Sequence, residues 1–328
     1  MQLWSVPAEG GYLYSDNLSD HLRMEAQPLT KFRQFCTLPD EEFGGLHRGD
    51  TFRWNVYSAL RSRGRRLSET APIPESGFEI TQKSMTIYEA GISVPYTGKL
   101  NALARHQVVS IIDRTLKDDC RKFHDTEAFL QMKRTPLRAS PTSGTSTTSV
   151  DFTTNSTANT TNNVELGTGH VKAIVDYMKE RNIPAFMGDD YVCISHPTTY
   201  RTFKNSLESI RQYTETGLAQ IFRGELGKYE DTRFVEQNHI PKGGAADSTT
   251  FDPWTSVADG WNNAKSSWAM FCGGDLITEA PVVPEEVRAR LPGDFGRAKG
   301  IAWYYLGGYG LTFDDADNAR IVMWDSAA

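Results

Sequence analysis

The sequence predicts an α+β fold, because strand-like segments come before and after a block of helix-like segments rather than alternating with them. Apolar residues alternate with polar ones within residues 51–97, they recur at helical spacing between residues 98 and 210, and aromatic and β-branched residues with glycines fill the last third. With 328 residues and 39% hydrophobic content, the chain is long enough for about two ordinary domains with a substantial core.

The charge balance and the cysteines narrow the class of protein. A net charge of -6 and a pI near 5.7 argue against a dedicated nucleic-acid binder, but they do not exclude a container that faces nucleic acid.

No apolar run reaches the ~18 residues of a membrane span, and residues 1–12 lack the features of a signal peptide, so we expect cytosol-like surroundings. Cys36, Cys120, Cys193 and Cys272 have no CxxC spacing, which favours buried reduced thiols over disulfides or zinc.

The first hundred residues predict an arm followed by a long hairpin. Residues 1–49 are irregular, contain several prolines and have few periodic apolar positions, as in an extended arm. Phe52, Trp54 and Val56 then alternate with more polar residues, and a second alternating run occupies residues 78–96. The polar segment between these runs contains two prolines, so we expect the tip of the hairpin there.

The hairpin tip carries four arginines within six residues, namely Arg61, Arg63, Arg65 and Arg66. They can be a solvated loop, they can form ion pairs with an acidic patch of another subunit, or they can contact phosphate. Four neighbouring positive charges repel one another unless partners or solvent relieve them, and the acidic remainder of the chain supplies partners. We therefore treat these arginines as candidate inter-subunit contacts.

Residues 98–136 predict one long amphipathic helix. The stretch between Gly98 and Pro136 contains neither glycine nor proline. Apolar residues recur along one face at helical spacing, namely Val108, Ile112, Leu116, Cys120 and Phe123. A helix over most of this stretch would span roughly 45 Å. Because the heptad seam of a coiled coil is missing, we expect a single helix laid against a sheet.

Residues 140–163 consist almost wholly of Ser, Thr and Asn with small residues. Such a composition buries too little apolar surface to offset the entropy lost on ordering. We therefore expect a surface loop or a weak hairpin that tolerates shortening, with Val150 and Phe152 as its apolar anchors.

The following block predicts a helix, a strand, a second helix, a turn and a second strand. The first helix carries Val171, Ile174, Val175 and Met178 on one face and ends near Asn182 and Pro184. "DYVCISHP" predicts a short buried strand, and Pro197 opens a helix with Tyr200, Phe203, Leu207 and Ile210 on one face. "GELGKYEDTRFVEQN", from Gly224 to Asn238, predicts a glycine-flanked turn and a strand over 232–237, which we expect to join the earlier strand in one sheet.

No specific catalytic or cofactor motif accompanies these elements. GxSxG, HExxH, Walker A and EF-hand patterns are absent. "LGTGHV" brings Gly167 and Gly169 to a helix start, but it lacks the third glycine and the preceding strand of a dinucleotide site, so helix entry is the simpler interpretation. We therefore predict a protein that is not an enzyme and has no catalytic, cofactor-binding or metal-binding residues.

The remaining polar candidates also have simpler interpretations. Among the seven histidines, only His124-Asp125 and His196-Pro197 fall near predicted element ends, and a metal site would need three to converge. The pairs Asp189-Asp190 and Asp314-Asp315 are typical of solvated turns. "GGYG", residues 307–310, is typical of a strand that bends where two backbones approach closely.

The order of the predicted elements resembles that of a known family. "GELGKYEDTRFVEQN" is similar to the Gly-x-Leu-Gly segment, and "MFCGGDLITEA" to the Gly-Asp strand, of the major capsid proteins of tailed bacteriophages, which have the Hong Kong 97 fold. The likeness covers nearly the whole chain. Because each short motif is common by itself, the resemblance depends on the order and spacing of the elements.

The resemblance implies a division of the chain. It places an N-terminal arm in residues 1–50, an E-loop hairpin in 51–97 and the spine helix of a peripheral domain in 98–139. It further places a Ser/Thr/Asn-rich surface loop in 140–163, an axial domain in 164–258, and the strand-rich remainder of both domains in 259–328.

The resemblance also implies a function. Such a protein assembles with copies of itself, in the host cytoplasm, into the hexamers and pentamers of an icosahedral virion head. The partners implied are a portal, a cement or decoration protein, and packaged double-stranded DNA bound without sequence specificity, with no membrane. The sequence lacks the long helical N-terminal extension that serves some members as an internal scaffold, so a separate scaffolding protein is expected. An encapsulin-type nanocompartment shell, which has the same fold, and an uncharacterised α+β enzyme are the alternatives.

Overall fold

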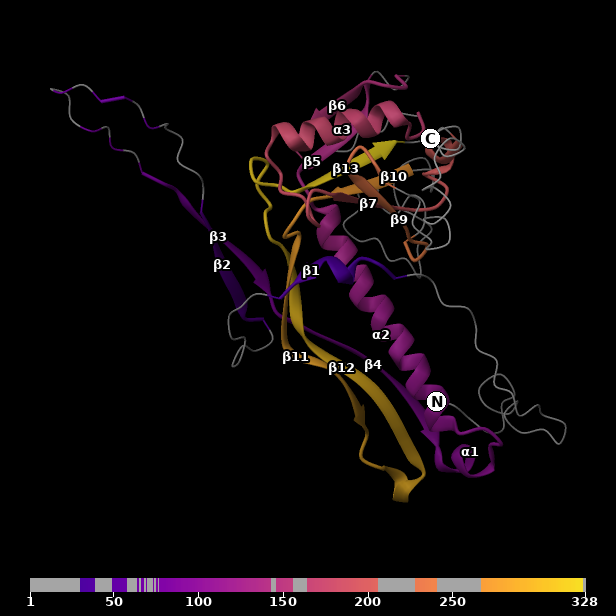
Figure 1. Ribbon diagram of the computed structural model, residues 1–328. Coiled ribbons are helices and arrows are strands. Elements are labelled where there is room, and N and C mark those ends of the chain that lie inside the picture. The colour runs from indigo at the N-terminus through magenta and orange to yellow at the C-terminus, as the bar shows by residue number, and fades with distance from the viewer. Residues whose placement is uncertain are drawn as a thin grey trace.

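The computed structural model describes residues 30–38, 49–57, 77–142, 146–155, 164–205, 228–240 and 267–326, together with positions 64, 66, 67, 69, 73 and 75. The molecule is elongated (Figure 1). One end consists of a sheet covered by the helix α3, the other end consists of a long sheet beside the helix α2, and a two-stranded ribbon projects sideways from the region between them.

Two sheets and a ribbon make up the β-structure. The four-stranded sheet has the order β1 (Cys36–Thr37), β11 (Ile277–Ala289), β12 (Ala298–Leu311) and β4 (Tyr88–Thr97). The seven-stranded sheet has the order β6 (Val150–Thr153), β5 (Leu137–Pro141), β13 (Ile321–Ser326), β10 (Ser267–Cys272), β7 (Tyr191–Ser195), β9 (Thr232–Glu236) and β8 (Lys228–Tyr229). The ribbon consists of β2 (Thr51–Tyr57) and β3 (Ile80–Thr86).

The strand predictions agree with this architecture, and the α+β class is confirmed. β2 and β3 pair antiparallel, as expected for the hairpin. The second alternating run, expected over residues 78–96, leaves the hairpin after Thr86, because from Tyr88 it continues as β4 and pairs with β12 in the four-stranded sheet. β7 is buried along its whole length and pairs parallel with β9, so the two strands expected to share a sheet do so. The last third of the chain supplies β10 to β13, and the glycine-rich stretch at 307–310 lies within β12.

The prediction of one continuous helix over residues 98–136 is wrong. The chain forms a short helix, α1 (Gly98–Leu103), and a long one, α2 (Val108–Lys133), with extended backbone at Ala104 between them. Thr97 caps α1 by accepting a hydrogen bond from the backbone N–H of Leu100. Leu100 and Val108 are both buried and lie eight residues apart, a spacing that fits one helical face. The spacing of the apolar residues is therefore the same as in one continuous helix and does not reveal the break at Ala104.

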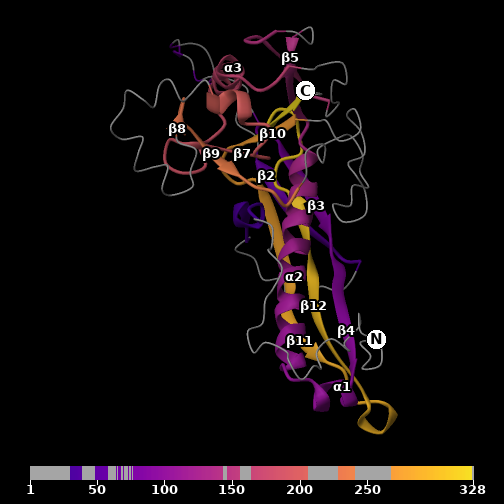
Figure 2. The ribbon, with the colours of Figure 1, turned by 90° about the vertical axis from the view of Figure 1, so that its right-hand side faces the viewer.

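α2 packs along one face of the four-stranded sheet (Figure 2). Its 26 residues correspond to about 39 Å at 1.5 Å per residue. The face predicted from helical spacing is the buried one. Its first four members, Val108, Ile112, Leu116 and Cys120, are all less than a tenth exposed, and the fifth, Phe123, is partly buried against the same core. In β12, alternate residues from Ile301 onward point toward this helix, as the two-residue period of a strand requires.

The helix α3 (Thr168–Glu180) covers the seven-stranded sheet on the side away from α2. Its predicted face, Val171, Ile174, Val175 and Met178, is buried. It ends before Asn182, which adopts a left-handed conformation with φ 55°, as residues after a helix often do. Gly167 is the N-cap, so the interpretation of this glycine pair as a helix entry is correct.

The sequence left a surface loop and a weak hairpin open for residues 140–163, and the described part forms the hairpin. β5 and β6 form an antiparallel hairpin at the edge of the seven-stranded sheet, so the alternative of a hairpin holds there. Phe152 stacks on Tyr177 of α3 with ring centroids 3.9 Å apart. A Cβ added at Gly169 would lie 2.9 Å from the Cα of Thr148, which shows how closely this hairpin packs on α3. Residues 156–163 lie outside the described part.

The helix expected to open at Pro197 is present as helical residues 201–205, preceded by a turn. Tyr200 and Phe203 are fully buried, as their predicted positions on an apolar face require. Leu207 and Ile210 lie outside the described residues, as does the Gly-x-Leu-Gly segment 224–227.

The arm expected in residues 1–49 is not purely peripheral, because part of it is buried. Phe32 is 0% exposed and Phe35 is 4% exposed. A 3₁₀ turn (Arg33–Phe35) leads into β1, which pairs in parallel with β11. The described part of the predicted arm therefore packs into the core, and we call this segment the strap and define it as residues Lys31–Thr37. The preceding residues 1–29 lie outside the described part.

The root of the ribbon crosses β12 at two glycines. A Cβ at Gly308 would lie 2.8 Å from the carbonyl oxygen of Thr86, and one at Gly310 would lie 2.9 Å from the ring of Trp54. Phe52, Met85 and Ile87 form a small core with Ala280 at this crossing. The interpretation of "GGYG" as a place of close backbone approach is therefore correct.

This crossing gives a prediction for stability. Gly308→Ala places a methyl group against a backbone carbonyl and is expected to lower the free energy of unfolding by roughly 1–3 kcal/mol, the usual cost of overpacking. Gly300→Ala in the same strand is the matched control, because a Cβ there meets nothing closer than 3.7 Å. Urea unfolding of the unassembled subunit measures both, and equal losses for the two variants would contradict the role given to Gly308.

Candidate functional site

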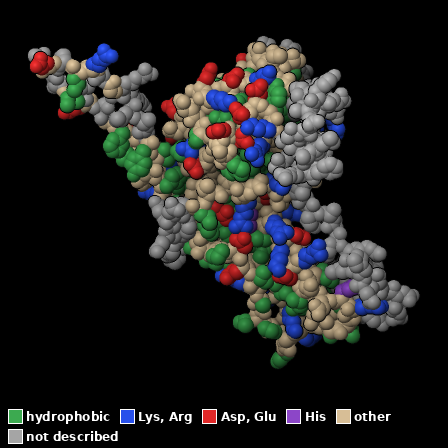
Figure 3. Space-filling view, in the orientation of Figure 1, with side chains coloured by type: hydrophobic (Ala, Val, Ile, Leu, Met, Phe, Trp, Pro, Cys, Tyr) green, Lys and Arg blue, Asp and Glu red, His purple; other side chains and the backbone are tan. Residues whose placement is uncertain are grey.

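The arginines proposed as inter-subunit contacts belong to the segment between β2 and β3, of which little is described. Arg61, Arg63 and Arg65 lie outside the described residues, whereas Arg66 is described and exposed. The structure therefore does not test their role. The ribbon carries exposed apolar side chains: Tyr57 is 68% exposed and Ile80, its partner in register, is 49% exposed. Figure 3 shows such side chains gathered along the projecting ribbon.

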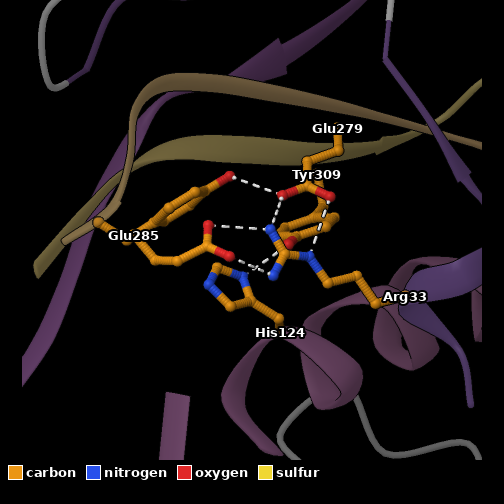
Figure 4. Close-up of polar contacts among 6 residues, drawn as sticks. Arg33, His124, Glu279, Glu285 and Tyr309 are labelled. Atoms are coloured by element: carbon orange, nitrogen blue, oxygen red, sulfur yellow. Dashed lines mark hydrogen bonds and ion pairs between the residues drawn. The ribbon is translucent and has the colours of Figure 1, made fainter. Parts of the chain in front are cut away.

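A second group of polar residues lies in the body of the molecule, beneath the strap. It includes His124 and Asp125, which lie within α2 rather than at its end and are almost fully buried. We call the group the polar junction, and its members are Arg33, His124, Asp125, Glu279, Glu285 and Tyr309. Figure 4 shows Arg33 held between two carboxylates with His124 and Tyr309 beside them.

Arg33 forms two paired contacts with carboxylates of β11. Its Nε and Nη2 donate to Glu279 at 3.3 and 2.9 Å, and its Nη1 and Nη2 donate to Glu285 at 2.8 and 3.0 Å. Two-pronged guanidinium–carboxylate contacts fix orientation as well as distance. The strap is therefore held in one register on β11, where Thr37 also donates its hydroxyl to the carbonyl of Ile277.

The charges of this clamp stabilise one another. Burial alone would lower the pKa of Arg33, but its hydrogen bonds to Glu285 and Glu279 outweigh burial and raise it. The hydrogen bond from Arg33 lowers the pKa of Glu285 to about 2, so this carboxyl is ionised at neutral pH. The Glu285 side chain is 41% exposed, so solvent screens part of this attraction.

His124 and Asp125 form the floor of the junction. The backbone N–H of Phe32 donates to Asp125 Oδ1 at 2.6 Å, and His124 Nδ1 shares a hydrogen bond of 2.6 Å with the Tyr309 hydroxyl. Burial raises the pKa of Asp125 to about 6 even though backbone hydrogen bonds oppose the shift, and burial lowers the pKa of His124 to about 4. Both residues are therefore pushed toward their neutral forms.

The strap links the two sheets. Phe32 packs against Phe129 of α2 and Trp268 of β10, with ring centroids 5.2 and 6.2 Å apart. Phe35 packs against Phe186, which precedes β7. Since β1 and Arg33 attach to β11, one short segment contacts both the four-stranded and the seven-stranded sheet.

The junction has the chemistry of a structural clamp. Its guanidinium is already bound by two carboxylates, and its histidine is buried and neutral at physiological pH. Within the described ranges, no group of three or more His, Cys, Asp or Glu side chains is placed to hold a metal ion. The four cysteines are free, and Cys120, Cys193 and Cys272 are buried as expected.

A second charged cluster surrounds the turn between β8 and β9. Glu230 and Asp231 have φ values of 48° and 54°, and two successive left-handed residues are typical of a tight hairpin turn. The described turn therefore lies at these residues. Asp190 accepts hydrogen bonds from Lys228 and Arg233, which lower its pKa. Because Asp190 is only 6% exposed, the expectation of a solvated turn residue is wrong for it.

The other acidic pair holds the root of the ribbon. Lys83 of β3 forms ion pairs with Asp314 and Asp315, which follow β12. Trp54 of β2 donates its indole N–H to the carbonyl of Thr312 at 3.2 Å. These contacts fasten both strands of the ribbon to one loop.

Comparisons with known proteins identify the fold. Neither a protein-family model nor a curated protein matches the chain. Among solved structures, the capsid of cyanophage P-SCSP1u matches with a TM-score of 0.67 at 14% identity, over 95% of this chain and 93% of that chain. The capsid of Ralstonia phage GP4 gives a TM-score of 0.64 at 14% identity, covering 95% and 94% of the two chains.

The head of the Helicobacter pylori bacteriophage KHP40 matches with a TM-score of 0.66 at 12% identity, over 96% of each chain. The chain has the Hong Kong 97 capsid fold. This confirms the fold expected from the order of the elements. At identities of 12% to 14%, the likeness to these structures is one of fold. None of the described helices is long and apolar enough to cross a membrane.

The two opposed pKa shifts at the junction give a prediction. Asp125 binds a proton more tightly in the folded state than in the unfolded state, so its contribution to the free energy of unfolding grows as pH falls through 6. His124 binds a proton less tightly in the folded state, so its contribution to the free energy of unfolding falls as pH drops from 6.5 to 4. The two effects oppose each other in the parent. Asp125→Asn keeps a side-chain oxygen that accepts the hydrogen bond from the Phe32 N–H, but it removes the proton uptake of Asp125 and leaves that of His124.

We expect the unfolding free energy of the parent, minus that of Asp125→Asn, to rise by roughly 2–3 kcal/mol between pH 7 and pH 4. Urea unfolding across this pH range measures it. Asp113→Asn, a change farther from the junction on the same helix, is the control and should show no comparable trend. A constant difference for Asp125→Asn would show that this carboxyl is not desolvated as described.

Proposed function

We propose that this protein is the major capsid protein of a tailed bacteriophage, which assembles with copies of itself into the hexamers and pentamers of an icosahedral head. The observation that supports this most strongly is the match of nearly the whole chain to phage capsid structures. A structural role rather than an enzymatic one is also consistent with the polar junction, whose charged groups are occupied by one another.

The same proposal assigns the described helices and strands to the parts of a capsid protein. α2 is the spine helix, the four-stranded sheet belongs to the peripheral domain, and the seven-stranded sheet with α3 belongs to the axial domain. The β2–β3 ribbon is the E-loop, and the strap belongs to the N-terminal arm. Packaged double-stranded DNA, a separate scaffolding protein, a portal and a cement or decoration protein are the partners that accompany this role, and the virion is its location.

The projecting ribbon favours assembly for a physical reason. A two-stranded ribbon is marginally stable in water by itself, and this one exposes Tyr57, Ile80 and Phe78 beyond its packed root. A second copy of the chain that covers these side chains would remove them from water. An encapsulin-type shell would use the ribbon in the same way, so the packaged content distinguishes the two: DNA with a portal for a phage head, a cargo enzyme for a nanocompartment.

The first test is the size of the assembled protein. We expect the expressed chain, with scaffold supplied, to form capsomers or closed shells that negative-stain microscopy shows directly. Light scattering should give masses many times the 36.7 kDa of one chain. A single species of that mass across salt and concentration would contradict the proposal and would favour the enzyme alternative.

The second test concerns the tip arginines. Changing Arg61, Arg63, Arg65 and Arg66 together to Ser should leave the unfolding free energy of the unassembled subunit within roughly 1 kcal/mol of the parent, as is usual for surface substitutions. The same change should weaken assembly in a salt-sensitive way, because exposed ion pairs are screened by salt.

The matched control changes the same four residues to Lys, which keeps the charge, and should assemble nearly as well as the parent. If the Ser variant assembles as well as the parent at both low and high salt, the arginines are solvated loop residues.

A further inference from the structure

We propose that the strap opens as a unit while both sheets stay folded, and that the clamp of Arg33 on Glu279 and Glu285 is the latch that keeps it closed. The proposal concerns a conformational device within one subunit. It therefore does not depend on the assembly proposed above.

The strap is attached through few regular contacts. β1 has two residues, and it pairs with β11 only at Ile277 and Thr278. The 3₁₀ turn before it has three residues and no side-chain cap. Apart from the Phe32 and Phe35 side chains, the closed position depends on the Arg33 clamp, the Thr37 hydroxyl and the backbone contacts to Asp125. Such a segment opens at lower cost than a strand paired along its length.

The residues beneath the strap, His124 and Asp125, are polar, and their side chains lack part of the hydrogen bonds that they could form. Within the part of the chain that the structure describes, His124 Nε2 and Asp125 Oδ2 are buried and have no hydrogen-bond partner. A buried polar atom without a partner destabilises the state that buries it. When the strap lifts, water reaches these atoms, so their hydration offsets part of the loss of Phe32 burial. The closed state is therefore favoured less strongly than its aromatic contacts alone would suggest.

The latch itself lies at the surface. The Arg33 side chain is 35% exposed and that of Glu285 is 41% exposed, so both reach water with little rearrangement. Glu279 is only 6% exposed, and it accepts two hydrogen bonds from the guanidinium. Loss of Arg33 would leave this carboxylate beneath the strap without its cation, which favours the open state.

Both sheets keep their own support when the strap opens. The core between the seven-stranded sheet and α3 contains no strap residue. The core around α2 contains Phe32 and Phe35, but most of its members come from α2, β10, β12 and β13. Three covalent connections also join the sheets: α2 to β5, β10 to β11, and β12 to β13. Opening would uncover the Phe129 and Trp268 rings and the backbone edge of β11 at Ile277.

Cys36 in β1 reports on opening. Its thiol lies in the strap and is partly buried, whereas the thiols of Cys120, Cys193 and Cys272 lie in the cores. In the unassembled full-length subunit, iodoacetamide labelling followed by mass spectrometry of each cysteine peptide gives four separate rates. Opening of the strap alone accelerates Cys36 and leaves the other three unchanged.

Arg33→Gln is the decisive variant. Its electrostatic effect alone would slow the labelling of Cys36, whereas opening of the strap would speed it up. Burial raises the pKa of Cys36 well above its usual value, and the charge of Arg33 opposes that rise, so removal of Arg33 makes the reactive thiolate still scarcer in a closed strap. Faster labelling can then come only from opening. We expect an increase of about tenfold or more at Cys36, and a smaller one for Arg33→Lys, which keeps the charge but loses the two-pronged geometry.

Arg288→Gln is the matched control. Arg288 is also an arginine paired with a glutamate, but it belongs to β11 and lies over the Tyr304 ring, away from the strap. It should leave all four rates unchanged. An unchanged Cys36 rate in Arg33→Gln would show that the clamp is not a latch. Equal acceleration of all four cysteines would show that the strap opens only when the whole subunit unfolds, and either result would overturn the proposal.

Discussion

The packing of one face of α2 against both sheets is the contact on which the rest of the structure depends. The first half of the helix covers β12 and its neighbours, and the second half reaches the Trp268 and Met270 side of β10. Two sheets of different strand order therefore share one core. The short strap lies where they meet, and its two aromatic side chains pack on Phe129 of α2 and on Phe186 before β7.

The sequence predicted the elements whose apolar pattern matches their period. Val108 to Cys120 in α2, Val171 to Met178 in α3 and the alternating residues of β2 and β3 were found because burial of one face imposes a spacing. The order of these elements was enough to suggest the fold. The break at Ala104 could not be seen, because Leu100 and Val108 fall on one face of a continuous helix as well as on two separate helices.

The site residues were harder to predict because their partners are distant in sequence. Arg33 lies 246 positions from Glu279 and 252 from Glu285, and no local pattern joins them. Phe32 and Phe35 gave a weak signal, since they are large apolar residues in a segment taken as a peripheral arm. Asp190 was misjudged for the same reason: its partner Arg233 is supplied by β9, which becomes its neighbour only through parallel pairing with β7. The sequence left a loop and a hairpin open for the β5–β6 segment, because Val150 and Phe152 are the apolar anchors of an otherwise polar stretch; both pack against the core, and Phe152 stacks on Tyr177.

The glycine crossing beneath the ribbon has a mechanical consequence. Because Gly308 and Gly310 let β3 and Trp54 rest directly on the backbone of β12, the ribbon is fixed at its root, and among the described residues its outer part projects from the body of the molecule. The ribbon therefore turns as a rigid arm about the point where these two glycines contact it. Any small tilt of β12 is magnified at the distal end, so the direction in which the ribbon points is a sensitive indicator of the shape of the sheet that carries it.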